Sequence, residues 1–480
     1  MPTAHVGHLH QTVSPFGSDL RTRYHARWVI PVTAPTIEHG TVVVEGERII
    51  WVGPRGDAPE GRDEDLGEVI LTPGLVNTHT HLDLTVMRGF LEGLSFFSWI
   101  RTLTAARAEL TYEELLASAR LGIIEGLRHG ITTFADTAPS PAAFDAMRAL
   151  GVRGIAYRET FGPDPRVWQQ SVDDLRRAVR AMQTYETPLV RVGVSPHAPY
   201  SVSDALYVGV AAFARAHQLP VATHIAESAE ESDLVTGGEG AFAAFLHGRK
   251  IDVATRARSP IALLEQTGVL AERPLLIHCV RTDAADLATI AAHNCGVAHC
   301  PASNAKLGHG IASLLEMRDA GIHVGLGTDS MASNNRMHLL DEGRLAILAQ
   351  RARTGRDDLF TGRDALEMAT LGGAKALGMG GIIGSIERNK VADLAAFPVP
   401  DESYPVYEPA DALVWSLSNA PASLVVVNGV PRVRNGRVLG IDVGEESQVV
   451  RDTAQRLARW KRARSGTVTP TSLTFLPRVR

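Results

Sequence analysis

Residues 73–81 read Pro-Gly-Leu-Val-Asn-Thr-His-Thr-His, and this stretch decides how the rest of the chain is interpreted. A mostly apolar run over 69–76 leads into two histidines that are separated by one residue. Residues i and i+2 of a strand point to the same face, so His79 and His81 would present two imidazoles side by side at a strand end. Zn²⁺ binds such a pair readily, whereas two surface histidines on a loop would carry no chemistry. The rest of the chain must therefore supply further metal ligands.

Composition excludes several classes of protein. The chain has 480 residues, 45% hydrophobic and 21% charged, which is typical of a soluble globular protein. A formal net charge of −5 gives no basic surface for nucleic acid, and no apolar run is long enough to span a membrane. The N-terminal stretch lacks the apolar segment of a secretion signal, and the three cysteines show no Cys-x-x-Cys spacing. We therefore expect a cytoplasmic protein whose partner is a small molecule, with no nucleic-acid or membrane partner, and leave open whether it forms a homo-oligomer.

Strand and helix patterns alternate after residue 81. Helices are predicted over 112–129, 142–150, 172–186 and 203–217, and strands over 131–135, 153–157, 190–194, 221–225, 275–277, 296–298 and 324–326. The first helix has Thr111 as a plausible cap and two glutamates in its first turn. With the strand that carries the histidine pair, these make about eight strands, each followed by helical sequence. The pattern predicts an α/β fold with a (β/α)₈ TIM-type barrel rather than an open doubly wound sheet.

Both ends of the chain carry strand patterns without candidate chemistry. Residues 41–53 form two β-rich runs around a Glu-Gly-Glu turn, a hairpin signal. Strand patterns return at 384–387, 392–397 and 424–429. We therefore predict a small β-sandwich domain (21–70 plus 383–445) with the catalytic barrel (71–382) inserted into it. Residues 1–20 are expected to be a disordered lead-in, and 446–480 a C-terminal helix and tail, the helix either covering its own barrel or docking on a neighbour.

Side chains with metal-binding or acid–base chemistry follow the predicted barrel strands. In TIM-type barrels, active residues lie at the C-terminal ends of the strands. The residues found there are His79, His81, His197, His224, His278, His299 and Asp329, with Glu227 three residues after His224. Surface histidines scattered at random would not fall at the ends of consecutive apolar strands. The pattern predicts one active site at this end of the barrel.

A subset of these residues makes a complete ligand set for one divalent metal ion. A catalytic zinc takes about three or four nitrogen and oxygen ligands and keeps a position for water. The chain offers His79, His81, His224 and Asp329. Zn²⁺ is the expected ion, and Fe²⁺ also suits three imidazoles and a carboxylate. Glu227 would act as general acid/base, with Asp329 and His278 holding and orienting the water, although a glutamate at a helix start is otherwise often only solvated.

The motifs resemble those of the amidohydrolase superfamily, specifically the cytosine/adenosine-type deaminases and related chlorohydrolases. The matching stretches are 73–81, Ser-Pro-His-Ala-Pro-Tyr (195–200), Thr-His-Ile-Ala-Glu (223–227), Ile-His-Cys (277–279), His-Cys-Pro-Ala-Ser-Asn-Ala-Lys-Leu (299–307), Gly-Thr-Asp-Ser-Met-Ala-Ser-Asn-Asn (327–335), 384–387 and 392–394. The resemblance implies a mononuclear metal barrel that replaces an exocyclic amine, or sometimes a chloride, with hydroxyl. Members with two metal ions usually bridge them with a carboxylated lysine, but here no lysine precedes Lys250.

The resemblance also suggests substrate contacts. The sequence is similar to deaminases of methylthioadenosine, S-adenosylhomocysteine and 6-aminodeoxyfutalosine, and the predicted contacts are Trp99, Arg101, Arg107, Arg158, His197 and Ser333. Trp99 matches a tryptophan on the loop after the histidine pair, and His197 and Ser333 match positions on the purine side. Arg107 stands where some of these deaminases have a glutamate that holds the ribose hydroxyls. The three arginines would instead meet an anionic group, because guanidinium pairs with carboxylate bidentately.

Three functions fit these observations. The first is metal-dependent hydrolytic deamination of an adenosine-like nucleoside, with release of ammonia, the substrate bearing a carboxylate as in 6-aminodeoxyfutalosine or S-adenosylhomocysteine. The second is deamination or dechlorination of another N-heterocycle, such as a triazine or a guanine-like ring. The third is a non-catalytic amidohydrolase-like scaffold. Such scaffolds usually lose metal ligands, whereas this chain keeps the full set.

Overall fold

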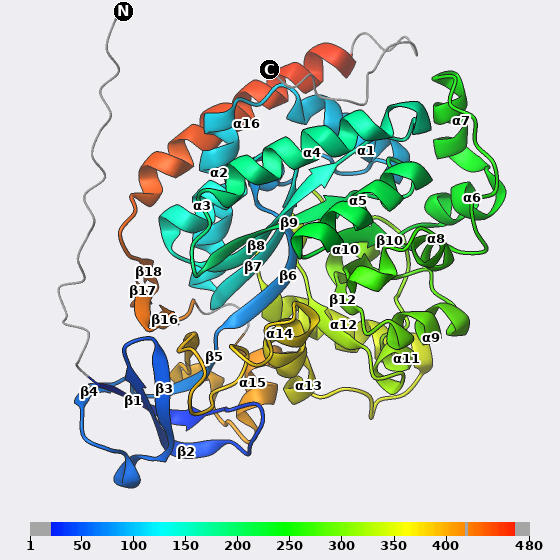
Figure 1. The fold of residues 1–480 in the computed structure, drawn as a ribbon. Coiled ribbons are helices and arrows are strands. Elements are labelled where there is room, and N and C mark those ends of the chain that lie inside the picture. The colour runs from blue at the N-terminus through cyan, green and yellow to red at the C-terminus, as the bar shows by residue number, and fades with distance from the viewer. Residues whose placement is uncertain (1–20, 418–420, 466–480) are drawn as a thin grey trace, which may run out of the picture.

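Two parallel sheets and one mixed sheet organise the chain in the computed structural model, which describes residues 21–417 and 421–465 (Figure 1). The predictions for 1–20 and for the tail beyond 465 lie outside the described residues. One parallel sheet has the order β14-β6-β7-β8-β9 and the other β10-β11-β12-β13. Their strands are β6 (Leu75–His81), β7 (Ile131–Ala138), β8 (Arg153–Thr160), β9 (Val190–Pro196), β10 (Ala222–Ile225), β11 (Leu275–His278), β12 (Gly296–His299), β13 (His323–Leu326) and β14 (Asp329–Ser330). All the barrel strands predicted between residues 131 and 326 are confirmed.

Helices follow these strands and lie around the two sheets (Figure 1). They include α2 (Tyr112–Arg128), α3 (Ala142–Leu150), α4 (Trp168–Gln183), α5 (Asp204–His217), α6 (Ala229–Gly237), α7 (Gly240–Gly248), α8 (Pro260–Gln266), α9 (Ala284–Ala292), α10 (Pro301–Lys306), α11 (Leu314–Asp319), α12 (Leu339–Thr354), α13 (Gly362–Glu367), α14 (Gly373–Ala376) and α15 (Pro409–Trp415). The predicted cap of α2 is confirmed, because the Thr111 hydroxyl accepts from the Glu114 amide and the Glu114 carboxylate accepts from the Thr111 amide. In the described part of the chain, no helix combines the length and the apolar character needed to cross a membrane.

The two parallel sheets meet each other on both sides. A parallel bridge joins Val194 of β9 to Val221, just before β10. On the other side, the Thr78 hydroxyl of β6 donates to the Leu326 carbonyl of β13 at 2.8 Å. Apolar side chains from both sheets, including Ile155 of β8, share one buried cluster. These contacts fit a TIM-type barrel, while its closure stays a prediction.

The mixed sheet is built from both ends of the chain, as predicted. Its strands are β1 (Thr22–Val29), β2 (Ile37–Glu45), β3 (Arg48–Pro54), β4 (Arg62–Asp65), β5 (Val69–Pro73), β15 (Leu394–Pro398), β16 (Leu424–Val427), β17 (Val430–Arg434) and β18 (Arg437–Val438). The ends join where β5 pairs with β15, and the β2–β3 hairpin is confirmed. The strand predicted at 384–387 is wrong, since Gly384 has a φ of 90°, which extended strands do not use. That the sheet forms a separate β-sandwich, and the domain boundaries, stay predictions.

The C-terminal helix α16 (Val443–Ser465) lies along α2 of the same chain (Figure 1, red). The Arg120 guanidinium pairs with Glu446 at 2.8 Å, and Arg456 pairs with Glu114 at 2.5 Å. Leu457 is fully buried in an apolar cluster that also contains Trp99 of α1 (Phe96–Arg107). Of the two predicted roles for this helix, the structure therefore shows it covering its own chain.

A buried ion pair connects β8 to the mixed sheet. The Arg153 guanidinium donates to both carboxylate oxygens of Asp393, at 2.8 and 3.2 Å. Only 8% and 2% of the two side chains are exposed. The Asn428 amide adds a hydrogen bond to the same carboxylate at 2.7 Å. Buried charges are tolerated when they are paired in this way, so removing one partner leaves the other uncompensated.

We expect Asp393→Ala to lower the free energy of unfolding by about 3–5 kcal/mol, because Arg153 then stays buried without a counter-charge. The double variant Arg153→Met/Asp393→Leu should recover most of that loss, since no buried charge remains. Urea denaturation of the parent and the two variants measures both effects. A cost well below 1 kcal/mol for Asp393→Ala, or a double variant no more stable than Asp393→Ala, would contradict this role.

Candidate active site

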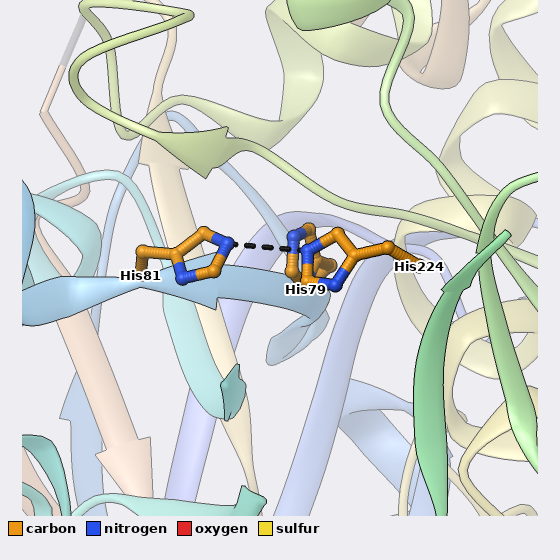
Figure 2. A group of neighbouring side chains, drawn as sticks. All are labelled: His79, His81 and His224. Atoms are coloured by element: carbon orange, nitrogen blue, oxygen red, sulfur yellow. Dashed lines mark hydrogen bonds between the residues drawn. The ribbon is translucent and has the colours of Figure 1, made fainter. Parts of the chain in front are cut away.

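Three histidines from two strands converge at the C-terminal ends of the parallel sheets (Figure 2). His79 and His81 come from the end of β6, and His224 comes from β10. One ring nitrogen from each lies within 4.8 Å of the other two. The Nε2 atoms of His81 and His224 are 3.3 Å apart. The i, i+2 spacing of the first two histidines thus places them where a third, 143 residues later, can meet them.

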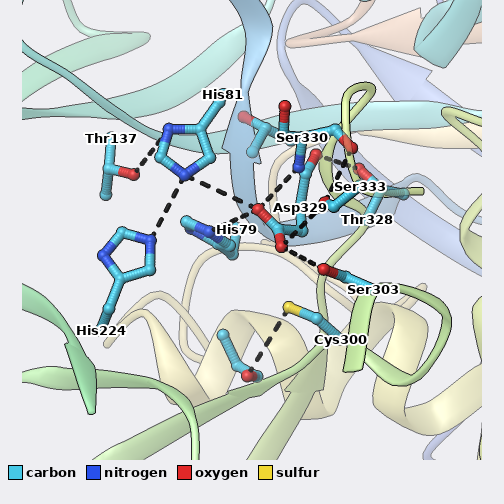
Figure 3. Close-up of polar contacts among 12 residues, drawn as sticks. His79, His81, Thr137, His224, Cys300, Ser303, Thr328, Asp329, Ser330 and Ser333 are labelled. Atoms are coloured by element: carbon cyan, nitrogen blue, oxygen red, sulfur yellow. Dashed lines mark hydrogen bonds and ion pairs between the residues drawn. The ribbon is translucent and has the colours of Figure 1, made fainter. Parts of the chain in front are cut away.

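A carboxylate completes the cluster (Figure 3). Asp329 Oδ1 lies 3.2 Å from His79 Nε2 and 3.6 Å from His81 Nε2. The Ser330 amide donates to Oδ1 at 2.6 Å, and the Ser303 hydroxyl donates to Oδ2 at 2.5 Å. Burial acts to raise the pKa of Asp329, but the nearby His79 and the other surrounding histidines outweigh it and hold this pKa well below its usual range. The side chain is therefore a carboxylate aimed at the three imidazoles.

These four side chains fit a single divalent ion. Two nitrogens that bind one tetrahedral zinc at about 2.0–2.1 Å lie about 3.3 Å apart, which matches the His81–His224 pair. Burial lowers the pKa of His81 to about 4 and that of His224 well below its ordinary value, so both imidazoles are in the neutral form that binds metal. Neither ring nitrogen of His79 has a hydrogen-bond partner among the described residues. The donor set is therefore suited to a metal in chemistry and in spacing.

Hydrogen bonds behind the ring of His224 fix the direction of its lone pair. Its Nδ1 atom lies 3.3 Å from the backbone carbonyl oxygen of His197. A carbonyl oxygen only accepts, so Nδ1 carries the hydrogen and Nε2 keeps a lone pair toward His81. Metal-binding histidines commonly donate their other N–H to a carbonyl or carboxylate in this way. The Thr137 hydroxyl lies 3.5 Å from His81 Nδ1, on the side of that ring away from His224.

Glu227 stands beside the cluster with two histidines on one of its oxygens. Its Oε1 atom lies 3.5 Å from His278 Nε2 and 3.2 Å from His309 Nε2. Burial acts to raise the pKa of Glu227, but the facing imidazoles of His278 and His309 outweigh it and lower this pKa. The Asn304 amide oxygen accepts from His278 Nδ1 at 2.9 Å, which leaves His278 Nε2 facing the site. Glu227 is therefore an ionised group that can take up a proton.

Neither His309 nor Asn304 was predicted from the sequence to be a functional residue. His309 lies between two glycines in the loop after α10, so the strand-end rule that found the other histidines does not reach it. Its ring packs edge-on against Phe96, with centroids 4.4 Å apart. Asn304 lies within a motif that was recognised, but the motif alone assigned it no contact. His299, found by the rule, is buried at the end of β12 and does not line the cavity.

A cavity of about 440 Å³ opens onto these side chains. It is lined by His81, His224, Asp329, Glu227 and His278, by α1 and its surroundings through Phe96, Trp99, Ile100, Leu103, Thr104 and Arg107, and by Asp83, Glu159, Phe161, His197 and Tyr200, among others. The volume suits a ligand of nucleoside size. One wall is largely apolar and comes from α1, while the base carries the candidate metal site.

Three of the predicted substrate contacts line this cavity. Trp99 and Arg107 extend from α1, and His197 follows β9. The Arg107 guanidinium forms an ion pair with the buried carboxylate of Asp83. His197 Nδ1 is hydrogen-bonded to the Ser201 hydroxyl at 2.7 Å. These residues are placed to touch a ligand, although Arg107 already has a carboxylate partner.

The structure does not bring the other three predicted contacts into this cavity lining. The Arg101 guanidinium carbon sits 5.6 Å from the centroid of the Phe97 ring, outside the cavity lining. Arg158 faces the opposite side of β8 and lines a separate cavity of about 270 Å³ against α4. Its strand position decides this, because neighbouring strand residues point to opposite faces. Ser333 is buried and donates to Asp329 Oδ2 at 3.2 Å, so it holds a candidate metal ligand.

Comparisons with known proteins agree with this geometry. The sequence matches the profile of the amidohydrolase family over residues 70–432. It is 33% identical over 439 residues to the 5-methylthioadenosine/S-adenosylhomocysteine deaminase of Desulforudis audaxviator, covering 90% of this chain and 97% of that protein. The fold is similar to a zinc-bound adenosine deaminase from Xanthomonas campestris (TM-score 0.81, 26% identity, 91% and 98% of the two chains). It is also similar to zinc-bound atrazine chlorohydrolase from Arthrobacter aurescens (TM-score 0.78, 26% identity, 90% and 100%).

The hydroxyl groups that hold Asp329 should matter for metal binding. We expect the double variant Ser303→Ala/Ser333→Ala to lower Zn²⁺ affinity by about 10–100-fold, because the carboxylate loses both hydroxyl donors on Oδ2. Competition with a chromophoric chelator measures the affinity. Ser195→Ala is the matched control, since this buried hydroxyl has no partner in the described structure and should leave the affinity unchanged. Equal affinities in all three proteins would show that the hydroxyls do not support the metal site.

Proposed function

The chain belongs to the amidohydrolase family, and we propose that it hydrolytically deaminates an adenosine-like nucleoside, replacing the 6-amino group of the adenine ring with hydroxyl and releasing ammonia. The observation that carries the proposal is Glu227, a buried carboxylate that lies beside a complete one-metal donor set in a nucleoside-sized cavity. The name of the Desulforudis relative, a deaminase of adenosine derivatives, supports the same chemistry.

Each residue of the site has a separate role in the proposed reaction. A divalent ion held by His79, His81, His224 and Asp329 would lower the pKa of a water molecule toward neutrality. Glu227 takes the proton of the attacking water on Oε1 and passes it to the ring nitrogen next to the reacting carbon. His278 Nε2 hydrogen-bonds the attacking oxygen and holds it over that carbon. The hydroxyl group now on the carbon then gives its proton to the amine, the carbon–nitrogen bond breaks, and ammonia leaves while the oxygen stays on the ring.

The native ion is proposed to be one Zn²⁺ per chain, with Fe²⁺ as the alternative. Three imidazoles and one carboxylate suit both ions, so the donor set does not distinguish them. The zinc-bound structural relatives favour zinc. The absence of any lysine before Lys250 supports a single ion, because a bridging lysine cannot come from the earlier strands.

A neutral nucleoside is now favoured over one that carries a carboxylate. The prediction of a carboxylate-bearing substrate depended on three arginines, Arg101, Arg107 and Arg158. Arg101 and Arg158 lie outside the cavity lining, and Arg107 is paired with Asp83. None of the three arginines therefore both lines the cavity and lacks a carboxylate partner. The proposal therefore moves from 6-aminodeoxyfutalosine and S-adenosylhomocysteine toward uncharged adenosine derivatives.

Two other functions remain as alternatives to the deamination of a nucleoside. Hydrolysis of a triazine or another N-heterocycle is supported by the likeness to atrazine chlorohydrolase, which extends over 90% of this chain. A non-catalytic scaffold is opposed by the complete donor set and by the ionised Glu227 next to it.

Closure of the two parallel sheets into one barrel belongs to the proposal as well, since the contacts on both sides support it. Cytoplasmic location and oligomeric state stay predictions.

The proposal predicts ammonia release from adenosine or one of its uncharged derivatives by the zinc-loaded protein. Glu227→Gln should lower kcat by about 10²–10⁴-fold with an unchanged metal content, because the amide cannot carry the proton. Glu230→Gln, a partly exposed carboxylate on the neighbouring helix α6, is the control and should behave like the parent. Coupled ammonia assays on a panel of nucleosides and triazines give the rates. Turnover of triazines alone would replace the proposal by its first alternative, and no turnover at all would favour the scaffold.

A further inference from the structure

A second buried carboxylate faces the cavity and has no part in the reaction described above. Glu159 lies near the end of β8 and lines the cavity. Its residue surface is only 7% exposed, and its Oε1 atom has no hydrogen-bond partner among the described residues. Tyr157, two positions earlier, is buried among the inward-facing side chains of both sheets, so strand alternation directs Glu159 to the same side. Buried polar atoms are nearly always paired, which indicates that a ligand supplies the missing partner.

The neighbours of Glu159 do not form a second metal site with it. A carboxylate oxygen of Glu159 and one ring nitrogen each of His197 and His224 lie within 4.8 Å of one another. However, His224 directs Nε2 at His81 and Nδ1 at a backbone carbonyl, so it has no nitrogen left to give. His197 Nδ1 is engaged by the Ser201 hydroxyl. One imidazole nitrogen and one carboxylate remain, fewer than the about three or four ligands that a metal needs.

The nearby arginine does not satisfy Glu159 either. Arg107 lines the same cavity, but its guanidinium is paired with Asp83, whose carboxylate also accepts from the Ser140 hydroxyl at 3.2 Å. No ion pair joins Arg107 to Glu159 in the described structure. Glu159 therefore borders the space that the ligand fills and carries a carboxylate oxygen without a protein partner. It lies beside His197, to one side of the Glu227 and His278 pair that handles the reacting carbon.

We propose that Glu159 binds a sugar hydroxyl of the substrate and thereby sets a preference for hydroxylated over deoxygenated nucleosides. The proposal rests on the proposed function, since it assumes a nucleoside in the cavity. A hydroxyl is the suitable partner because it can donate to a carboxylate oxygen and can also accept from a carboxyl group. An amino group attached to the ring can only donate, and an apolar substituent would leave the buried oxygen without a partner.

The test compares kcat/KM of the parent and two variants on four nucleosides. Zinc-loaded parent, Glu159→Ala and Glu159→Gln are assayed for kcat/KM on adenosine and its 2′-deoxy, 3′-deoxy and 5′-deoxy derivatives. The parent should prefer adenosine over one of the three by about 10–100-fold, the cost of leaving a buried polar group without its hydrogen-bond partner. Glu159→Ala should lose that preference by becoming slower on adenosine and on the two derivatives that keep the bound hydroxyl, while its rate on the derivative that lacks it stays within about threefold. Glu159→Gln should keep part of the preference.

A matched control separates this role from damage to the strand. Thr160→Val alters the next residue of β8, which lies outside the cavity lining, and should leave every substrate ratio unchanged. If Glu159→Ala slows all four nucleosides by the same factor, the residue only positions His197 and His224, and the proposal is overturned. It is equally overturned if the variant changes discrimination of 2,6-diaminopurine riboside, which adds a ring amine, but no deoxy derivative.

The failure of the proposed function would be recognised separately. If the parent turns over no nucleoside, the same ratios are read from dissociation constants, measured by calorimetry on the zinc-loaded proteins. A hydroxyl preference in binding that Glu159→Ala removes would then support the role of Glu159 while the deaminase proposal falls. An unchanged preference, or no binding of any nucleoside to the parent, would overturn the role of Glu159 as well.

Discussion

The close approach of two buried imidazole nitrogens, His81 Nε2 and His224 Nε2 at 3.3 Å, is the constraint on which the site depends. At this distance either one nitrogen donates a hydrogen to the other or both direct lone pairs at a shared cation. The carboxylate of Asp329 lies 3.2 Å from His79 Nε2 and 3.6 Å from His81 Nε2, so four donor atoms surround one point. A cation there offsets the cost of burying the carboxylate and the unpaired ring nitrogens together. The fold supplies this arrangement by bringing the ends of β6, β10 and β14 to the same edge of the parallel sheets.

Much of the fold was predictable because its signals are local. The cap at Thr111, the alternation of apolar strands with amphipathic helices and the hairpin over 41–53 each depend on residues close in sequence. The His-x-His spacing likewise fixes the relative direction of His79 and His81 before any tertiary contact is known. The prediction of a strand at 384–387 was wrong because Gly384 has a positive φ, which interrupts an otherwise β-rich sequence. The conformation of a glycine within a strand pattern cannot be predicted from that pattern alone.

The substrate-facing half of the site was less predictable, since it depends on which face of an element a side chain occupies and on loop packing. Arg158 and Glu159 are neighbours on β8, yet one faces a separate cavity and the other faces the ligand space. His309 reaches Glu227 from a loop between glycines, which no strand periodicity describes. Ser333 was placed against the substrate by resemblance, whereas its hydroxyl holds Asp329. Tertiary contacts of this kind leave no periodic mark in the sequence.

X-ray absorption at the zinc edge of the metal-loaded protein tests the central claim most directly, because it reports the atoms around the ion without a substrate. The account predicts one zinc per chain with only nitrogen and oxygen neighbours at about 2.0–2.2 Å and the multiple-scattering signal of about three imidazoles. A sulfur neighbour at about 2.3 Å would place the ion on the cysteines. A second metal at about 3.5–4 Å would make the site dinuclear. Either result would contradict the single His₃Asp centre from which the proposed reaction follows.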